Sequence, residues 1–452
     1  MSDPNVTLSQ VRARMRELGA RALFAKRLSP NDNSKNQVYL GGDFRVINLL
    51  PAGAPVAATS GTHGKPIFKA PLRLEWLDDS GRTFPAPAAQ LILYPQYPEV
   101  RMSGFLKGAA WAPSDLLASR DEGRVLLVGV TADGRILGYA AAADSQVEQE
   151  LRLVPTDGDA AVLSRIALGG DPTMADSRTR LLERLCRVAK SGWIPGWRLN
   201  PDGSRRPCTA LNCVGVTLES ELGITANGRA EPDFEGWEVK AHTVANFSRA
   251  GTGAVTLMTP EPTGGDYKRL DIVEFVRRYG YADKRGRADR MNFGGIHKVG
   301  RRCAATGLTL TLNGYDASSG KMTDAAGSLA LLDDAGHIAA SWDFAGLLAH
   351  WSRKHARAVF VPAMKDAAPE VRFRYGHEVL LAEGTDYTKV LLRGLADGTV
   401  YYDPGIKVEN ESGAAKAKKR SQMRVSRGKL ASLYHNTSRE RACRTHTLGA
   451  VG

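Results

Sequence analysis

Two carboxylates and one amine lie close together in this sequence, at a spacing that suits phosphodiester chemistry. Asp233 follows a proline, Glu238 comes five residues later, and Lys240 comes two residues after Glu238. The run GWEVKAH has the β-branched and aromatic content of a strand, in which residues i and i+2 point to the same side. Glu238 and Lys240 are therefore expected to share one face, while Val239 points into the core.

The pattern predicts a metal-assisted hydrolysis. Two carboxylates at a strand end make a hard oxygen site suited to Mg²⁺. Such an ion polarises a phosphate oxygen, stabilises the charge that builds in an in-line displacement, and acidifies a bound water. Lys240 would orient the attacking water or neutralise charge on the phosphorus. A Glu-x-Lys pair alone also occurs on ordinary exposed strands, so its context decides the interpretation.

His242 lies two residues beyond Lys240 and is expected on the same face of the strand. Histidine titrates near neutrality, which allows a general-base role. Packing within the fold and a phosphate contact are the alternatives.

Composition indicates a basic globular protein of more than one domain. The chain has 452 residues, 43% of them hydrophobic and 24% charged, and this length exceeds what one ordinary core organises. The net charge of +13 favours a polyanionic partner, because each Lys or Arg that displaces a condensed counterion strengthens binding to nucleic acid. A basic protein without such a partner is the alternative that charge alone leaves open.

Five scattered cysteines predict reduced thiols that serve as packing residues. The sequence has no apolar run of membrane-spanning length and no signal-peptide pattern at its start. We therefore expect a cytoplasmic protein with no membrane partner.

The chain divides by pattern into three parts. Residues 1–155 predict a mostly β domain with a helical start over residues 11–28, followed by short strands such as QVYL, LRLEWL, AQLILY, RVLLVGV and ILGYAAA. Residues 156–192 predict a helical linker, and residues 193–447 a mixed α/β domain. The segment 407–447 is basic, with KAKKR as its densest run, and reads either as a solvated tail or as a phosphate-contacting arm.

The segment around the carboxylates resembles a known nuclease family. GVTLESELGI, then PDF, then GWEVKA is similar to the MvaI/BcnI restriction endonucleases and the related MutH-like nucleases, which have the PD-(D/E)xK site. The resemblance assigns catalytic positions to Asp233, Glu238 and Lys240, with Mg²⁺ held by Asp233 and Glu238. It gives Glu219 the place of the upstream acidic residue, and Glu221 is the competing acid. Stretches as far as KKRSQMRVS also match, so the likeness covers most of residues 195–430.

The amino-terminal part resembles a second family. FAKRLSPNDNSKNQVYL, YPEVRMSGFLKG and RVLLVGVTADGRILGYAAAAD are similar to the EcoRII-like effector domain, a B3-like β pseudobarrel that reads DNA. Asn and Gln pair with adenine edges, Arg with guanine, and Glu with cytosine. Base contacts are therefore predicted for a set of polar residues in two loops: Asn33, Lys35, Asn36, Gln37, Glu99 and Arg101. Phosphate contacts are predicted for Lys26 and Arg27. An ordinary turn is the alternative for the first loop.

Together the two resemblances imply a type II restriction endonuclease of type IIE character, acting on double-stranded DNA. CCWGG is the favoured target, and two copies of the site are expected to bind, one per domain. A monomer can accommodate this arrangement, because both DNA-binding domains belong to one chain. In the carboxyl-terminal lobe, DNA contacts are expected from residues of both charges: Asp403, Lys407, Arg420, Gln422 and Arg424. A MutH-like nicking enzyme of repair and a non-catalytic DNA-binding regulator are the alternatives.

Overall fold

The computed structural model describes most of the chain, and the statements below concern these residues. They are 5–29, 37–41, 46–60, 64–96, 99–154, 162–169, 174–209, 213–225, 233–249, 253–355, 357–367, 370–385, 387–410 and 412–443. No helix among them is both long and apolar enough to cross a membrane.

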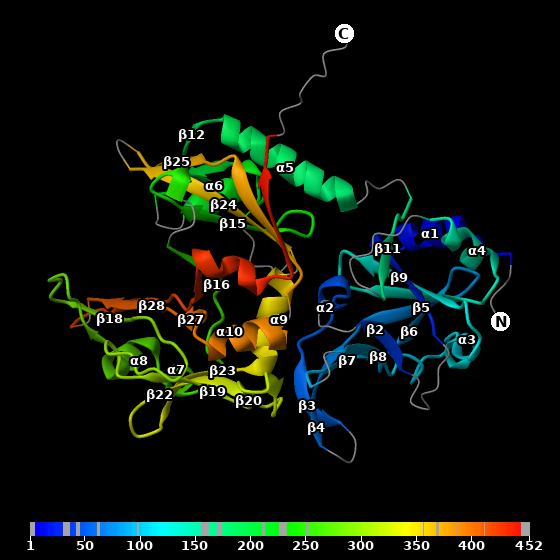
Figure 1. Ribbon diagram of the computed structural model, residues 1–452, viewed down its shortest axis with the longest axis horizontal. Helices are drawn as coiled ribbons and strands as arrows, with labels where there is room; N and C mark the ends of the chain where they lie inside the picture. The colour runs from blue at the N-terminus through cyan, green and yellow to red at the C-terminus, as the bar shows by residue number, and fades with distance from the viewer. Residues whose placement is uncertain are drawn as a thin grey trace, which may run out of the picture.

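The amino-terminal part contains two sheets and four short helices (Figure 1). The first sheet has the order β11 (Ser164–Ile166), β1 (Ala20–Arg27), β9 (Val125–Thr131), β10 (Ile136–Ala141), β5 (Leu74–Leu77) and β6 (Thr83–Ala86). The second has the order β2 (Val38–Gly41), β8 (Glu99–Ser103), β7 (Gln90–Tyr94), β4 (Lys65–Pro71) and β3 (Val56–Ser60). The helices are α1 (Leu8–Glu17), α2 (Val46–Leu49), α3 (Ser114–Ala118) and α4 (Gln146–Arg152). The mostly β character predicted for this part is confirmed.

The predicted helix over residues 11–28 is wrong in its second half. Thr7 caps α1 through a capping box with Gln10, but the helix ends at Glu17. Gly19 follows with a φ of 92°, the left-handed conformation that commonly ends a helix. The run ARALFAKR then forms β1, which pairs with β9 in the middle of a sheet, so tertiary pairing outweighs its amphipathic pattern.

The second part of the chain is built on a mixed sheet. Its order is β12 (Trp193–Pro195), β25 (Arg372–Tyr375), β24 (Arg357–Asp366), β26 (Glu378–Glu383) and β31 (Asn436–Arg441), and β15 (Glu238–Thr243) also pairs with β24, in parallel. Beside it lie α5 (Met174–Lys190), α6 (Cys213–Glu221) and a hairpin of β13 (Trp197–Leu199) and β14 (Arg205–Pro207). The apolar face of α5, in the predicted linker, is buried with β24 and β25 in one core.

The remaining elements form a lobe below this sheet in Figure 1. Its sheets are β16 (Ala254–Met258), β30 (Met423–Ser426) and β27 (Val400–Tyr402); β17 (Tyr281–Ala282), β18 (Arg290–Gly294), β28 (Gly405–Glu409) and β29 (Lys416–Lys418); β19 (Thr309–Asn313), β22 (Ser328–Leu332) and β23 (Ile338–Asp343); and β20 (Tyr315–Asp316) with β21 (Lys321–Met322). Its helical segments are η1 (Phe247–Arg249), α7 (Asp266–Arg269), α8 (Ile272–Tyr279), α9 (Phe344–Lys354), η2 (Tyr387–Leu392), α10 (Arg393–Ala396) and η3 (Arg427–Leu433). The KAKKR run supplies β29, so it belongs to the folded lobe and is not a tail.

The cysteine prediction is also corrected. Cys186 of α5 is disulfide-bonded to Cys443, which follows β31, and Cys208 is bonded to Cys213 at the start of α6. Cys303 is a free, buried thiol. The first pair joins segments that are 257 residues apart, a proximity that spacing in the sequence does not reveal.

Candidate active site

A tight turn directs the chain into β15. The backbones of Phe234 and Trp237 exchange hydrogen bonds of 2.9 and 2.8 Å. Between them, Glu235 and Gly236 have φ angles of 45° and 88°, and two consecutive positive values are typical of a type I′ hairpin turn. Arg180 of α5 holds the turn from outside, with Nε 2.9 Å from Oε2 of Glu235.

The turn returns Asp233 to the side of β15. Its Oδ2 accepts a hydrogen bond of 2.9 Å from the backbone N–H of Val239. Burial raises the pKa of Asp233, and the negative charge of Glu238 raises it further. The structure therefore brings together the two carboxylates that the sequence singled out, and the charge of Glu238 opposes the ionisation of Asp233.

The two oxygens of Glu238 have different surroundings. Oε1 lies 2.8 Å from Nζ of Lys240 and 3.2 Å from Nζ of Lys354. Oε2 is buried and has no hydrogen-bond partner. Because an unpaired buried charge is costly, this free oxygen indicates a place for a cation.

Glu219 of α6 is the third acid at this site. The pKa of its carboxyl is raised to about 7, first by burial and then by the charges of Asp233 and Glu238. Glu221 has a different environment, because its Oε1 accepts a hydrogen bond of 2.7 Å from Nε1 of Trp197. Of the two acids on α6, Glu219 is the one whose charge couples to the paired carboxylates.

These residues fit a hard divalent cation such as Mg²⁺. Asp233 and Glu238 present buried oxygens whose like charges a cation would relieve, and Oε2 of Glu238 has no other partner. Within the described part of the chain, no group of three His, Cys, Asp or Glu has metal-ligand geometry. A two-carboxylate site still suits Mg²⁺, which commonly keeps several waters and a phosphate oxygen as its other ligands.

Sequence reasoning missed Lys354, the last residue of α9. His355, which follows it, is fully buried and lies between two partners: Nε2 donates to the carbonyl oxygen of Leu257 at 3.1 Å, and Nδ1 accepts from the Tyr434 hydroxyl at 2.6 Å. These bonds fix the end of α9 and hence the position of Lys354. The only signal in the sequence is a lysine four residues before the apolar run AVFV.

His242 lies on β15 as expected, but its environment favours the neutral ring. Burial, followed by the charge of Arg427, lowers the pKa of His242 to about 4. Its Nδ1 is buried without a hydrogen-bond partner. At neutral pH the imidazole is therefore uncharged and retains a free ring nitrogen.

A family model described as the MvaI/BcnI restriction endonuclease family matches residues 182–434, which is more than half of the chain and contains the whole site. The chain belongs to the MvaI/BcnI restriction endonuclease family. Membership makes it a DNA-binding, DNA-hydrolysing enzyme. No curated protein matches it.

Two solved structures show similarity to the chain. One is the complex of the restriction endonuclease MvaI with its cognate DNA substrate, with 20% sequence identity, a TM-score of 0.43, and coverage of 59% of this chain and 99% of that one. The other is MvaI in the absence of DNA, with 19% identity, a TM-score of 0.32, and coverage of 60% and 99%.

The family match does not reach the predicted DNA contacts of the amino-terminal part. Lys26 is 6% exposed, and its Nζ donates to the backbone oxygen of Arg27 at 3.0 Å. Burial lowers the pKa of Lys26 to about 8. Arg27 is half-exposed and lies 2.6 Å from Glu148. The geometry leaves Arg27 more accessible to a phosphate than Lys26.

Three other predicted residues form one polar cluster: Glu99 and Arg101 lie on β8, and Gln37 immediately precedes β2, which pairs with β8. Arg101 Nη2 lies 3.0 Å from Oε1 of Glu99, and Arg101 Nη1 lies 3.3 Å from Oε1 of Gln37. Asn33, Lys35 and Asn36 lie outside the described residues. The cluster contains residues of both segments that the sequence predicted to read DNA, although Glu99 and Arg101 belong to a strand and not to a loop.

The predicted residues of the carboxyl-terminal lobe lie on adjoining strands. Arg424 Nη1 lies 2.5 Å from Oδ2 of Asp403, and Lys407 Nζ lies 2.5 Å from Oε1 of Glu409. Backbone hydrogen bonds join Asp403 to Gln422 and Gly405 to Arg420. These polar side chains thus come from one region around β27, β28 and β30.

Proposed function

We propose that this protein is a Mg²⁺-dependent type II restriction endonuclease that cuts duplex DNA at a short specific sequence and leaves a 5′-phosphate. The observation that carries the proposal is the buried carboxylate pair, with one oxygen of Glu238 balanced by two amines and the other without a partner.

The residues have separate roles in this proposal. Asp233 and Glu238 hold Mg²⁺, which supplies polarisation of a phosphate oxygen and acidification of a bound water. Lys240, held at Glu238, orients the attacking water and neutralises charge on the phosphorus. Glu219 adds a third negative charge beside the pair and is deprotonated when a cation occupies the site. The attacking water loses a proton to solvent as its oxygen bonds to phosphorus and the bond to the 3′-oxygen breaks. The leaving 3′-oxygen takes up a proton from solvent and becomes a hydroxyl.

We also propose a division of labour between two DNA-reading parts. The nuclease domain reads one copy of the site, for which CCWGG is our proposal, and the amino-terminal part is an EcoRII-like, B3-type effector domain that holds another. The restriction enzyme UbaLAI, which the chain resembles, has this combination of domains. The linked Gln37, Glu99 and Arg101 side chains support a reading surface on the effector domain, because such groups pair with base edges.

Contacts between the two parts support type IIE behaviour, in which a second DNA copy stimulates cutting. The helix α2 and strand β3 of the amino-terminal part lie against α9 (Figure 1). Val46 of α2 and Leu347 of α9 belong to one buried apolar cluster. Because α9 ends at Lys354, packed side chains connect α2 to the amine at Glu238. A shift of α2 on DNA binding can travel along such a chain of contacts.

The test is cleavage of a long DNA of known sequence with Mg²⁺, followed by sequencing of the ends. We expect every end at one repeated pentanucleotide motif, with Asp233→Asn and Lys240→Ala inactive. Ends without a common motif contradict site specificity. Retained cleavage in Asp233→Asn contradicts the assigned site.

The same assay separates the alternatives. A MutH-like nicking enzyme converts a supercoiled plasmid to the open circle without linear product. A DNA-binding regulator gives no cleavage with Mg²⁺ but retains binding.

A further inference from the structure

A basic pocket lies between β18 and β28 of the carboxyl-terminal lobe, and the carboxylate site does not use it. Its volume is about 380 Å³. Backbone of Gly294, Gly295 and Gly405 lines part of it. Gly295 has a φ of 121°, and a Cβ there would come within 2.8 Å of the Cys303 sulfur. A side chain at position 295 would therefore be strained, and glycine there keeps this part of the pocket lined by backbone.

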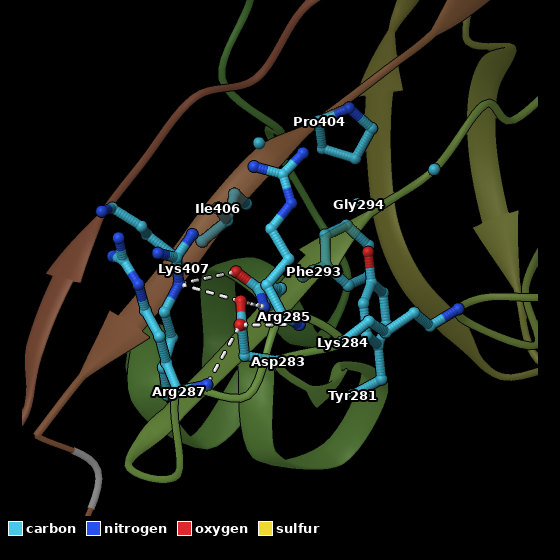
Figure 2. Close-up of a pocket in the computed structure, with 14 residues that line it drawn as sticks. Tyr281, Asp283, Lys284, Arg285, Arg287, Phe293, Gly294, Pro404, Ile406 and Lys407 are labelled. Atoms are coloured by element: carbon cyan, nitrogen blue, oxygen red, sulfur yellow. Dashed lines mark hydrogen bonds and ion pairs between the residues drawn. The ribbon is translucent and has the colours of Figure 1, made fainter.

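The rim of the pocket carries an excess of positive charge. Five basic residues line it against one acid, Asp283: they are Lys284, Arg285, Arg287, Arg290 and Lys407. Figure 2 shows Arg287 and Lys407 on one side of the pocket and Arg285 extending toward Pro404, while Lys284 extends to the other side with its Nζ 5.0 Å from the Tyr281 ring centroid. Such a concave cationic surface attracts an anion.

Asp283 organises this rim instead of neutralising it. Its Oδ2 accepts hydrogen bonds from the backbone N–H groups of Arg285 and Arg287, at 3.0 and 3.4 Å, which turns the loop so that both side chains are exposed. Its Oδ1 accepts from Asn292 at 2.9 Å and lies 3.5 Å from Arg290. Its carboxylate is thus committed to the backbone and to β18.

The charges of the rim are unequally balanced. Lys407, Arg290 and Arg287 share the single carboxylate of Glu409, at 2.5, 3.8 and 4.0 Å. No acidic side chain of the described segments pairs with Arg285, which is exposed. The pocket therefore has guanidinium groups available for a ligand, and guanidinium groups suit phosphate oxygens.

We propose that this pocket binds a backbone phosphate of the DNA duplex, away from the phosphodiester that is cut, and so fixes the register of the duplex on this lobe. The inference rests on the proposed function and deepens it. Lys407, one of the predicted DNA contacts, lines the pocket, and the other predicted contacts of the lobe lie on adjoining strands. Phosphate contacts of this kind position a protein without reading sequence.

The experiment measures DNA binding without cleavage. Asp233→Asn protein is titrated with a labelled cognate duplex and a scrambled duplex, without metal, over a series of salt concentrations. Arg285→Ala/Arg287→Ala in that background is compared with Arg393→Ala/Lys190→Ala, which removes the same charge from exposed helical positions outside the pocket. Thermal melting verifies that all variants fold.

We expect the pocket variant to weaken binding of both duplexes by about tenfold and to reduce the salt slope by about one to two, since each lost phosphate contact removes about one unit. The control variant should change both the DNA affinity and the salt slope far less. Equal effects in the two variants overturn the proposal, and so does weakening confined to the cognate duplex, which indicates base reading.

A competition experiment with inorganic phosphate tests whether the pocket binds a free anion instead of DNA. If inorganic phosphate at millimolar concentration displaces no DNA from the parent protein, the result supports a DNA duplex as the ligand. Pocket-dependent phosphate binding with unchanged DNA affinity overturns the proposal. Cleavage by the wild-type protein is measured separately. If the wild type does not cut DNA but the pocket variant still weakens binding, only the proposed function is refuted. If the wild type cuts DNA but the pocket variant binds as tightly as its parent, only the pocket proposal is refuted.

Discussion

Nζ of Lys354 lies 3.2 Å from Oε1 of Glu238, although the two residues are 116 positions apart in the chain. The amine lies at the end of α9, and Lys240 reaches the same oxygen from the strand itself. Glu238 thus receives one amine from its own strand and a second from a helix that also packs against the amino-terminal part.

Replacing Lys354 should slow cleavage without weakening Mg²⁺ binding. A charge-assisted hydrogen bond contributes about 1.5–3 kcal/mol, so Lys354→Met should lower the single-turnover rate by roughly ten- to a hundredfold. The Mg²⁺ concentration for half-maximal rate should stay level or fall, because a competing positive charge is removed. Lys354→Arg, which keeps the charge, is the control. An unchanged rate in Lys354→Met excludes a role for this amine.

The sequence predicts the parts of the site that are local in the chain. Asp233, Glu238 and Lys240 lie within one turn and one strand, so their shared face follows from strand geometry. Lys354 arrives through pairing of β15 with β24, and the Cys186–Cys443 bond also depends on tertiary structure. Spacing alone predicts neither. The strand β1 was missed because its pairing with β9 overrides an amphipathic pattern that favours helix.

Mg²⁺ should stabilise the wild-type protein, and Asp233→Asn should abolish this effect. The buried carboxylates repel one another without a cation, and a ligand that binds only the folded state raises its stability. We expect a Mg²⁺-dependent rise in the melting temperature of the wild type. Asp233→Asn should melt at the same temperature or higher without metal and respond little to Mg²⁺.

Cleavage gives the second readout for Asp233→Asn. Metal-ion catalysis contributes several kcal/mol, and a loss of about 4 kcal/mol lowers the rate roughly a thousandfold. Glu235→Gln, a nearby exposed acid that pairs with Arg180, is the matched control and should keep its cleavage. A full Mg²⁺ response in Asp233→Asn would exclude Asp233 as a ligand.

The stability of the metal-free protein should fall as the pH rises from about 4.5 to about 7. The folded pKa of Glu219 is raised from 4.5 to about 7, so in this window the folded protein keeps a proton that the unfolded chain has lost. Stability therefore decreases with rising pH and levels off above the folded pKa. Melting curves across this range should show a smaller slope for Glu219→Gln, and saturating Mg²⁺ should flatten the wild-type curve. Identical slopes in wild type and Glu219→Gln would contradict the assignment.

Removing Arg101 should separate basal cutting from its stimulation by a second DNA copy. Arg101 links Glu99 and Gln37 on the predicted reading surface, and loss of a good bidentate base contact costs about 1–3 kcal/mol. We expect Arg101→Ala to cut a single-site plasmid at the wild-type basal rate, while an added oligonucleotide duplex that carries the site stimulates it only at roughly ten- to a hundredfold higher concentration. Arg73→Ala, which removes an exposed arginine paired with Asp133 in the same part of the chain, should respond as the wild type does. If Arg101→Ala loses basal cutting as strongly as stimulated cutting, the cluster serves the nuclease domain directly and does not bind a second DNA copy.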